Sequence, residues 1–166
     1  HPMYRRQRQM CIRDSLMNNS LVDDKIKELF VSYRTIAIVG VSADINKASN
    51  RIMKFLRNTG YKVFPINPHT DNKIINGEKV YNNLEEIDDH IGIVNVFRPS
   101  EETIEIAKQS IKIGANVFWC QLGIHNESAA KLISENKIYY ISNKCIKVEY
   151  ERSVSYTHLR AHETDL

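Results

Sequence analysis

Short apolar runs alternate with segments of helical spacing along most of this chain, and this alternation restricts its fold more than any other feature. The run Thr35–Val41 is almost continuously apolar, as is typical of a strand covered on both faces. Further strands are predicted at Tyr61–Ile66, Ile91–Phe97, Asn116–Trp119 and Ile138–Ile141. Helices are predicted at Val22–Phe30, at Ser49–Asn58, from a cap at Ser100 to a stop at Gly114, at Glu127–Asn136 and at Lys144–Tyr150. The sequence therefore predicts an α/β fold, with a doubly wound, mainly parallel five-stranded sheet and helices on both faces.

The carboxyl ends of the predicted strands are the places where a binding site is expected. In a Rossmann-like sheet the crossovers are right-handed, and ligands bind outside those ends, at the point where the strand order reverses. The sequence places these ends at Gly40–Ser42, Asn67–Pro68, Phe97–Arg98 and Cys120–Gln121.

Both ends of the chain are interpreted as additions to the native protein. The peptide Met10–Ser15 can be encoded by codons whose reverse complement encodes Val154–His158, and the flanking residues extend this resemblance to translated sequencing-adapter DNA. A natural basic arm that binds nucleic acid is the alternative, but chance rarely makes the two ends of a chain complementary. We therefore predict adapter-like tails at residues 1–15 and 153–166, and one domain at residues 16–152.

Net charge and length limit the partners and the number of domains. The whole chain has a charge of +3, but residues 1–15 contain four arginines against one acidic residue. Without the two tails, residues 16–152 have a charge of +1. This small charge predicts neither a nucleic acid nor a membrane as partner, and no residue pattern names a protein partner. The remaining 137 residues suit a single domain with a core of its own.

The cysteines outside the tails show neither a disulfide nor a metal-binding pattern. Cys120 and Cys145 lie in apolar surroundings and lack CxxC or Cys/His metal spacing, so both are predicted to be buried free thiols in a reducing compartment. The sequence also contains no signal peptide, lipidation site or apolar run of membrane-spanning length. These features predict a cytoplasmic protein without a metal site.

Other conspicuous residues are interpreted as structural, and no catalytic residue is predicted. Cys120 ends an apolar strand, where a cysteine is more often part of the core than a nucleophile. Trp119 and Gln121 are candidates for lining a pocket, although Trp119 fits the core equally well. Three histidines in polar, loop-like segments are predicted to lie at the surface: His69, His90 and His125.

The segment after the first predicted strand starts like a dinucleotide-binding turn and then departs from it. The G-x-G-x-x-G fingerprint needs glycines for the turn, for contact with the pyrophosphate and for helix packing. Gly40 fills the first place, but Ser42 and Ile45 occupy the second and third. The acidic ribose-binding residue is also missing, because Asn67 and Pro68 follow the second strand. The sequence therefore disfavours NAD.

The same segment still suits a phosphate group. A helix that begins near Ser49 directs unpaired N–H groups and a partial positive charge at the loop. Lys47 and Arg51 add cations, and Ser42 adds a second hydroxyl. Arg98 follows a buried strand, so its guanidinium is expected to face the crevice and to grip phosphate. The alternative is that Ser49 is only a helix cap and Arg51 only a solvated surface cation.

Seven motifs occur in an order that resembles a known family. They are IAIVGVS, SNR at residues 49–51, YKVFPINP, GEKVY, VNVFRPSE, IGANVFWCQLGI and KCIKVEY. Together they look like the single-domain CoA-binding proteins of the succinyl-CoA synthetase α-subunit type, and the resemblance covers nearly all of residues 16–152. The chain departs from this family at Ala43–Ala48, where relatives have a proline-containing loop, and at Asn143–Lys144, where they have Asp-Arg.

The resemblance implies that three segments hold the cofactor. In that family the loop after the first strand and the helix behind it cradle the phosphates of CoA. The segment after the second strand lies beside the nucleotide, and the one after the third strand meets the cofactor as well. In this chain the three groups are Gly40, Val41, Ser42, Ser49 and Arg51; Asn67 and Pro68; and Val96, Phe97 and Arg98.

The resemblance further implies a stand-alone domain that binds CoA or an acyl-CoA without catalysis of its own. The family's ligating enzymes use a phosphohistidine and an ATP-grasp partner on further domains, and this chain has neither. A small NAD(P)-dependent oxidoreductase or nucleotide-regulated enzyme is the first alternative, although the second and third glycines of the dinucleotide-binding fingerprint are missing. An interaction module without nucleotide affinity is the second alternative, and it would have a sizeable apolar surface patch.

Overall fold

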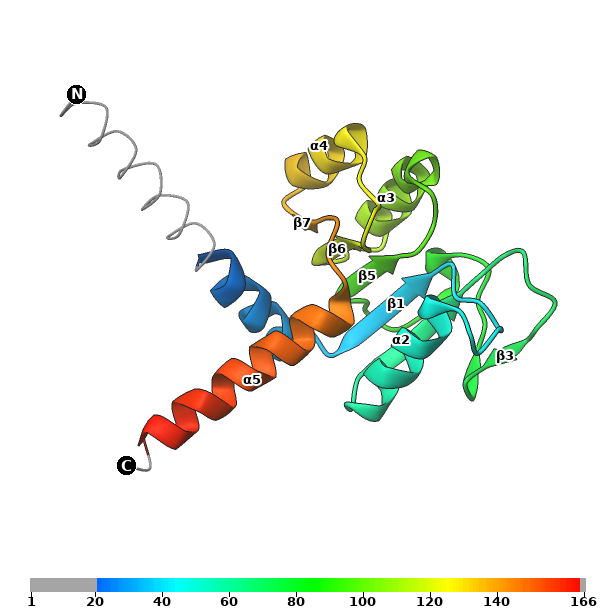
Figure 1. The fold of residues 1–166 in the computed structure, drawn as a ribbon. Coiled ribbons are helices and arrows are strands. Elements are labelled where there is room, and N and C mark those ends of the chain that lie inside the picture. The colour runs from blue at the N-terminus through cyan, green and yellow to red at the C-terminus, as the bar shows by residue number, and fades with distance from the viewer. Residues whose placement is uncertain (1–20, 165–166) are drawn as a thin grey trace, which may run out of the picture. The chain divides into compact units, whose positions relative to one another are not determined.

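The computed structural model of the chain describes residues 21–164, with side chains described up to residue 155 (Figure 1). These residues fall into two compact units. The larger unit is Tyr33–Glu149, and the smaller one contains the helix at residues 21–32 and the chain from Tyr150 onward. The predicted tail at residues 1–15 lies outside the described residues.

The larger unit contains a sheet of five parallel strands, as the sequence predicts. In their order across the sheet the strands are β2 (Lys62–Ile66), β1 (Thr35–Val39), β5 (Ile93–Val96), β6 (Val117–Cys120) and β7 (Tyr139–Ile141). The chain runs outward from β1 to β2 on one side and from β5 to β7 on the other. The strand order therefore reverses between β1 and β5, which is the arrangement of a doubly wound sheet.

Helices cover both faces of this sheet. Buried residues of α3 and α4, such as Ala107 and Ile133, join one apolar cluster with Val94 and Val96 of β5. Helix α2 contacts β2 but contributes no residue to that cluster, so it covers the face to which the alternate strand residues point. The bounds are α2 (Ala48–Asn58), α3 (Thr103–Lys112), α4 (Glu127–Glu135) and α5 (Ile146–Thr164).

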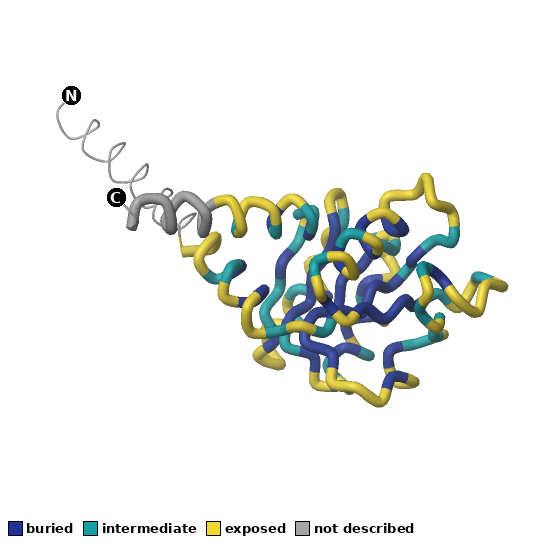
Figure 2. Tube along the Cα trace, turned by 90° about the horizontal axis from the view of Figure 1, so that it is seen from below, coloured by how far each residue is buried: buried dark blue, intermediate teal, exposed yellow. Residues whose placement is uncertain are grey.

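The strands form the buried centre of the larger unit (Figure 2). Phe118 and Trp119 are neighbours on β6, so they point to opposite faces, and both are fully buried. Each large apolar side chain removed from water in this way stabilises the fold by about 1.5–3 kcal/mol. Burial on both faces explains why the strands read as continuous apolar runs.

A short hairpin was not expected from the sequence. Strands β3 (Ile74–Ile75) and β4 (Glu78–Lys79) pair antiparallel around a turn in which Asn76 and Gly77 have φ values of 51° and 82°. Asn-Gly is a typical sequence for such a two-residue turn, because both central residues need positive φ. A single 3₁₀ turn at Leu84–Glu86 follows it.

Two predicted helix boundaries are wrong. Ser100 does not cap α3 but begins a 3₁₀ turn, Ser100–Glu102, in front of that helix, and its hydroxyl oxygen accepts the N–H of His125 at 3.3 Å. Helix α5 continues past Tyr150 to Thr164, because the sequence beyond Tyr150 has no glycine or proline to stop it.

In the smaller unit, the helix predicted at Val22–Phe30 is confirmed. Residues 21–32 are helical, and the side chains of Ile26 and Phe30 are buried. The ring of Phe30 meets that of Tyr150 edge to face at 5.4 Å, and Arg152 forms an ion pair with Asp23 at 3.1 Å.

Candidate functional site

The four predicted strand ends lie next to one another. They follow β2, β1, β5 and β6, which are consecutive in the sheet, and parallel strands end at the same edge. The reversal of strand order between β1 and β5 falls in the middle of this row. Ligands of open α/β sheets bind outside such a point, so these loops form the candidate site.

Gly40 directly follows β1 and can be replaced by no other residue without strain. Its φ of +96° lies in the left-handed region, and its N–H donates to the carbonyl of Ile66 at 2.8 Å. A Cβ on Gly40 would lie 2.7 Å from Cδ of Arg98. The aliphatic stem of Arg98 therefore passes directly over the loop after β1.

Ser42 is held from two sides by residues of α2. Its N–H donates to the hydroxyl of Ser49 at 3.0 Å, and its carbonyl accepts from the side-chain amide of Asn50 at 2.9 Å. Both partners are at least nine-tenths buried. In a dinucleotide-binding turn the residue at the place of Ser42 brings its backbone against the pyrophosphate. Here the N–H is already engaged, so the loop differs from that fingerprint in hydrogen bonding as well as in sequence.

Helix α2 begins without a side-chain cap and without an acidic residue in its first turn. Its N-cap residue is Lys47, and Ser49 lies inside the helix, so the alternative that Ser49 is the cap is wrong. Lys47 and Arg51 are both exposed, and within the described residues neither side chain has a hydrogen bond or an ion pair. The partial positive charge of the helix end and the two cations favour an anion at this position.

Asn67 connects the loops after β1 and β2. Its side-chain N–H donates to the carbonyl of Val41 at 2.8 Å, while its side-chain oxygen accepts the N–H of His69 at 2.8 Å. Pro68 is exposed beside it. The side chain of Asn67 thus orders the loops while it stays partly exposed, and Pro68 is more exposed than Asn67.

Arg98 is occupied by a partner that the sequence analysis did not identify. Its Nε and Nη2 each donate to one carboxylate oxygen of Glu102, both at 2.8 Å. This pairing raises the pKa of the Arg98 guanidinium and lowers that of the Glu102 carboxyl, so both are charged at neutral pH. The sequence contained one indication of this ion pair. Glu102 follows Arg98 by four residues, and opposite charges at positions i and i+4 meet on helical turns.

Two predicted site residues have no side chain at the surface. Val41 and Val96 are fully buried, so only their backbone groups are available to a ligand. Phe97 is half-buried, and its N–H donates to the carbonyl of Val39 at 2.9 Å, which joins the ends of β5 and β1.

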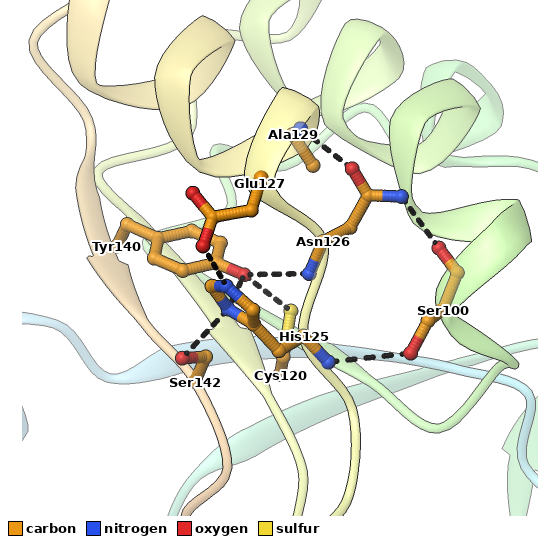
Figure 3. Close-up of polar contacts among 8 residues, drawn as sticks. All are labelled: Ser100, Cys120, His125, Asn126, Glu127, Ala129, Tyr140 and Ser142. Carbon is orange, nitrogen blue, oxygen red and sulfur yellow. Dashed lines mark hydrogen bonds and ion pairs between the residues drawn. The ribbon is translucent and has the colours of Figure 1, made fainter.

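A second polar cluster lies at the carboxyl ends of β6 and β7 (Figure 3). The hydroxyl oxygen of Tyr140 lies 3.8 Å from Sγ of Cys120 and 3.1 Å from Nδ1 of His125, and it accepts the N–H of Asn126 at 3.3 Å. Nε2 of His125 in turn faces a carboxylate oxygen of Glu127 at 3.2 Å.

Burial disfavours the charged forms of Cys120 and Tyr140 still further than in water. It raises the pKa of the Cys120 thiol to about 11 and that of the Tyr140 hydroxyl to about 12. Because the thiolate is the nucleophilic form, Cys120 is a poor nucleophile, and the prediction that it is buried is confirmed. His125 is exposed as predicted, but the sequence did not indicate that Tyr140 joins it to Cys120, which lies only five positions earlier.

Trp119 and Gln121 serve the core and not a pocket. Trp119 is fully buried, and its indole N–H donates to the carbonyl of Lys144 at 2.8 Å. The side-chain oxygen of buried Gln121 accepts the N–H of Ile146, the first residue of α5, at 2.9 Å. The prediction that Cys145 is buried is wrong, because this residue lies in the loop before α5 and is only half-buried.

The comparison with protein families decides the assignment. A family model described as a CoA binding domain matches residues 34–151, which include every loop of the candidate site. This chain belongs to the CoA-binding domain family. The Bacillus subtilis protein recorded as "Uncharacterized protein YneT" is 37% identical over 126 residues, which are 76% of this chain and 92% of that protein.

Solved structures share the fold. A hypothetical protein from Pyrococcus horikoshii is 35% identical with a TM-score of 0.76, over 80% of this chain and 92% of that one. A Thermus thermophilus protein is 25% identical with a TM-score of 0.76, over 79% of this chain and 98% of that one. An acetyl-coenzyme A synthetase of Candidatus Korarchaeum cryptofilum is 22% identical, which shows the fold alone; its TM-score is 0.57, and the match covers 66% of this chain and 26% of the synthetase.

Proposed function

We propose that this domain binds CoA or an acyl-CoA through the phosphates and the adenine of the cofactor. The observation that carries the proposal is the uncapped N-terminus of α2 beside exposed Lys47 and Arg51, at the reversal of strand order in a CoA-binding domain. CoA is an adenosine 3′-phosphate joined through a diphosphate to pantetheine, so it brings several negative charges to this point.

In this proposal α2 and its flanking cations bind the diphosphate. An anion at an exposed helix N-terminus gains about 0.3–1 kcal/mol from the helix dipole. Lys47 and Arg51 each add a charge that needs no rearrangement, because neither is paired within the described part of the chain. The loop from Gly40 to Ser42 forms the floor, and its shape is fixed beforehand by Ser49 and Asn50.

The loops after β2 and β5 would hold the nucleotide. Pro68 offers an exposed ring, Phe97 a half-buried one, and Arg98 a guanidinium for a phosphate. Asn67 contributes by positioning, since its side chain joins the loops after β1 and β2. Val41 and Val96 contribute through backbone groups only, because their side chains are buried.

We further propose that the domain binds its ligand without catalysing a reaction, in the cytoplasm. Burial raises the pKa of the Cys120 thiol to about 11, so little of the nucleophilic thiolate is present at neutral pH. None of the helices in residues 21–164 is both long enough and apolar enough to cross a membrane.

Calorimetric titration of the full chain with CoA, dephospho-CoA and NAD in parallel tests the binding proposal. We expect saturable binding of CoA, weaker binding of dephospho-CoA, which lacks the 3′-phosphate, and no binding of NAD. Binding of NAD without CoA would support the NAD(P) alternative. If none of the three ligands binds, the result would support an interaction module.

Two arginine variants locate the site. Arg51→Ala is expected to weaken CoA binding about three- to tenfold, because a unit charge about 4 Å from a phosphate in water is worth about 1 kcal/mol. Arg34→Ala is the matched control, since Arg34 is exposed at the opposite, amino-terminal end of β1. An equal loss in both variants would contradict the site.

A further inference from the structure

The ion pair of Arg98 and Glu102 stands where the proposed ligand needs a free cation. Arg98 follows β5, and its stem lies over Gly40, so its guanidinium belongs to the edge at which β1 and β5 end. Glu102 is the last residue of the 3₁₀ turn before α3. Two parallel hydrogen bonds of 2.8 Å join the groups. Their side chains are 35% and 47% exposed, so a solute can reach both.

A carboxylate and a phosphate use a guanidinium in the same way. Each presents two oxygens to two parallel N–H groups, and Glu102 takes the pair formed by Nε and Nη2. The Arg98 guanidinium keeps the pKa of the Glu102 carboxyl below its usual range, so Glu102 is fully charged at neutral pH. A phosphate that approaches Arg98 therefore finds Nε and Nη2 already bound to Glu102, and the negative charge of Glu102 repels it.

The pair is also weak enough to be displaced. Exposed pairs with this spacing contribute little to stability, because water screens the charges and both side chains lose freedom. A phosphate monoester with nearly two negative charges is a stronger competitor for the guanidinium than a carboxylate with one.

We propose that Glu102 competes with the phosphate of the ligand for Arg98, and so sets the affinity of the site and its preference for a terminal phosphate monoester. The proposal rests on the CoA-binding function proposed above. Binding then consists of an exchange in which the phosphate takes the fork of Arg98 and Glu102 is released to the solvent. A CoA-type ligand with a free 3′-phosphate drives this exchange better than a ligand that has only phosphodiester or diphosphate groups.

Calorimetric titration of Glu102→Gln with CoA measures the competition. We expect CoA to bind about three- to tenfold tighter than to the unmodified chain, because the variant removes both the competing charge and its repulsion of the phosphate. The gain should shrink in 0.5 M salt, since exposed charges are then screened over about 4 Å. Glu101→Gln is the matched control: it removes the same charge from the neighbouring exposed position, and it should change affinity less than twofold.

A second variant shows whether the effect passes through Arg98. In an Arg98→Ala background, Glu102→Gln should no longer tighten binding, because the contested guanidinium is gone. Dephospho-CoA should gain less than CoA from Glu102→Gln. Equal melting temperatures of the variants would exclude a change in folding as the cause.

The proposal is overturned if the unmodified chain binds CoA and Glu102→Gln binds it no better than Glu101→Gln does. It is also overturned if Glu102→Gln weakens binding, because Glu102 would then position Arg98 for the ligand. These outcomes leave the CoA-binding function intact. If neither the unmodified chain nor any variant binds CoA, the function proposed above fails and this inference fails with it.

Discussion

Replacement of Gly40 by alanine is expected both to destabilise the larger unit and to disturb the candidate site. An L-residue in left-handed backbone geometry, such as the φ of +96° at Gly40, costs about 1–2 kcal/mol. The new Cβ would lie 2.7 Å from Cδ and 3.1 Å from Cγ of Arg98, so this side chain must move. A stem forced from its preferred rotamer costs a further 0.5–1.5 kcal/mol or so. We therefore expect a total loss of about 1.5–3.5 kcal/mol.

Gly123→Ala separates the two contributions. Gly123 has a φ of +82°, and a Cβ added there would meet nothing within 4 Å. This control should lose only the backbone contribution, about 1–2 kcal/mol. Urea unfolding of both variants, followed by circular dichroism, gives the free energies of unfolding, provided that the slope with urea stays unchanged.

A double variant then tests the contact itself. In Gly40→Ala with Arg98→Ala the clash is absent, so the loss caused by Gly40→Ala should fall to that of Gly123→Ala. The reasoning is refuted if Gly40→Ala and Gly123→Ala cost the same in the presence of Arg98. It is also refuted if Gly40→Ala costs less than about 0.5 kcal/mol, because neither the strain nor the contact would then be real.

Three other predictions concern the residues that shape the site. Ser49→Ala should destabilise the domain by about 1–3 kcal/mol, because the N–H of Ser42 loses its acceptor. The control Ser128→Ala, at an exposed helical position, should change the free energy of unfolding by less than about 0.5 kcal/mol. Cys120 should be alkylated more slowly than half-buried Cys145 at pH 8, because its thiol is fully buried and has a pKa of about 11, so both reagent access and the thiolate fraction are low. Mass spectrometry of the peptides measures both rates, and faster labelling of Cys120 would contradict its burial and its raised pKa. Tyr140→Phe should cost about 1–2 kcal/mol of unfolding free energy, because the N–H of Asn126 loses its acceptor, and an unchanged midpoint in urea would count against the cluster.

The sheet could be predicted from the sequence because its strands are buried on both faces. Runs such as Thr35–Val41 have no polar interruption, and their length and β-branched composition separate them from helices. Glycines that follow two of the helices indicated where those helices end. The order of the strands could not be predicted from individual residues, because it depends on which strands pair. The loops that follow the strands could be placed at one edge of the sheet, because all the strands are parallel.

The contacts within the site could be predicted only in part. A serine near a helix start has several available partners, and the choice of Ser42 for Ser49 depends on how the loop folds back over seven residues. Arg98 was placed correctly at a strand end, but its partner Glu102 required knowing that a 3₁₀ turn brings the two residues together. Tyr140 reaches Cys120 because β6 and β7 are neighbours, which is a consequence of topology.

The central claim is that CoA binds at the carboxyl ends of β1, β2 and β5, and amide chemical shifts measured during a titration of the full chain with CoA test it most directly. The account predicts that the largest changes fall on the loop from Gly40 to Ser49, on Asn67 and on Phe97 to Glu102. Amides at the opposite ends of the strands, such as those of Gly92 and Gly114, should be unaffected. Changes confined to those opposite ends, or no changes at saturating CoA, would contradict the account.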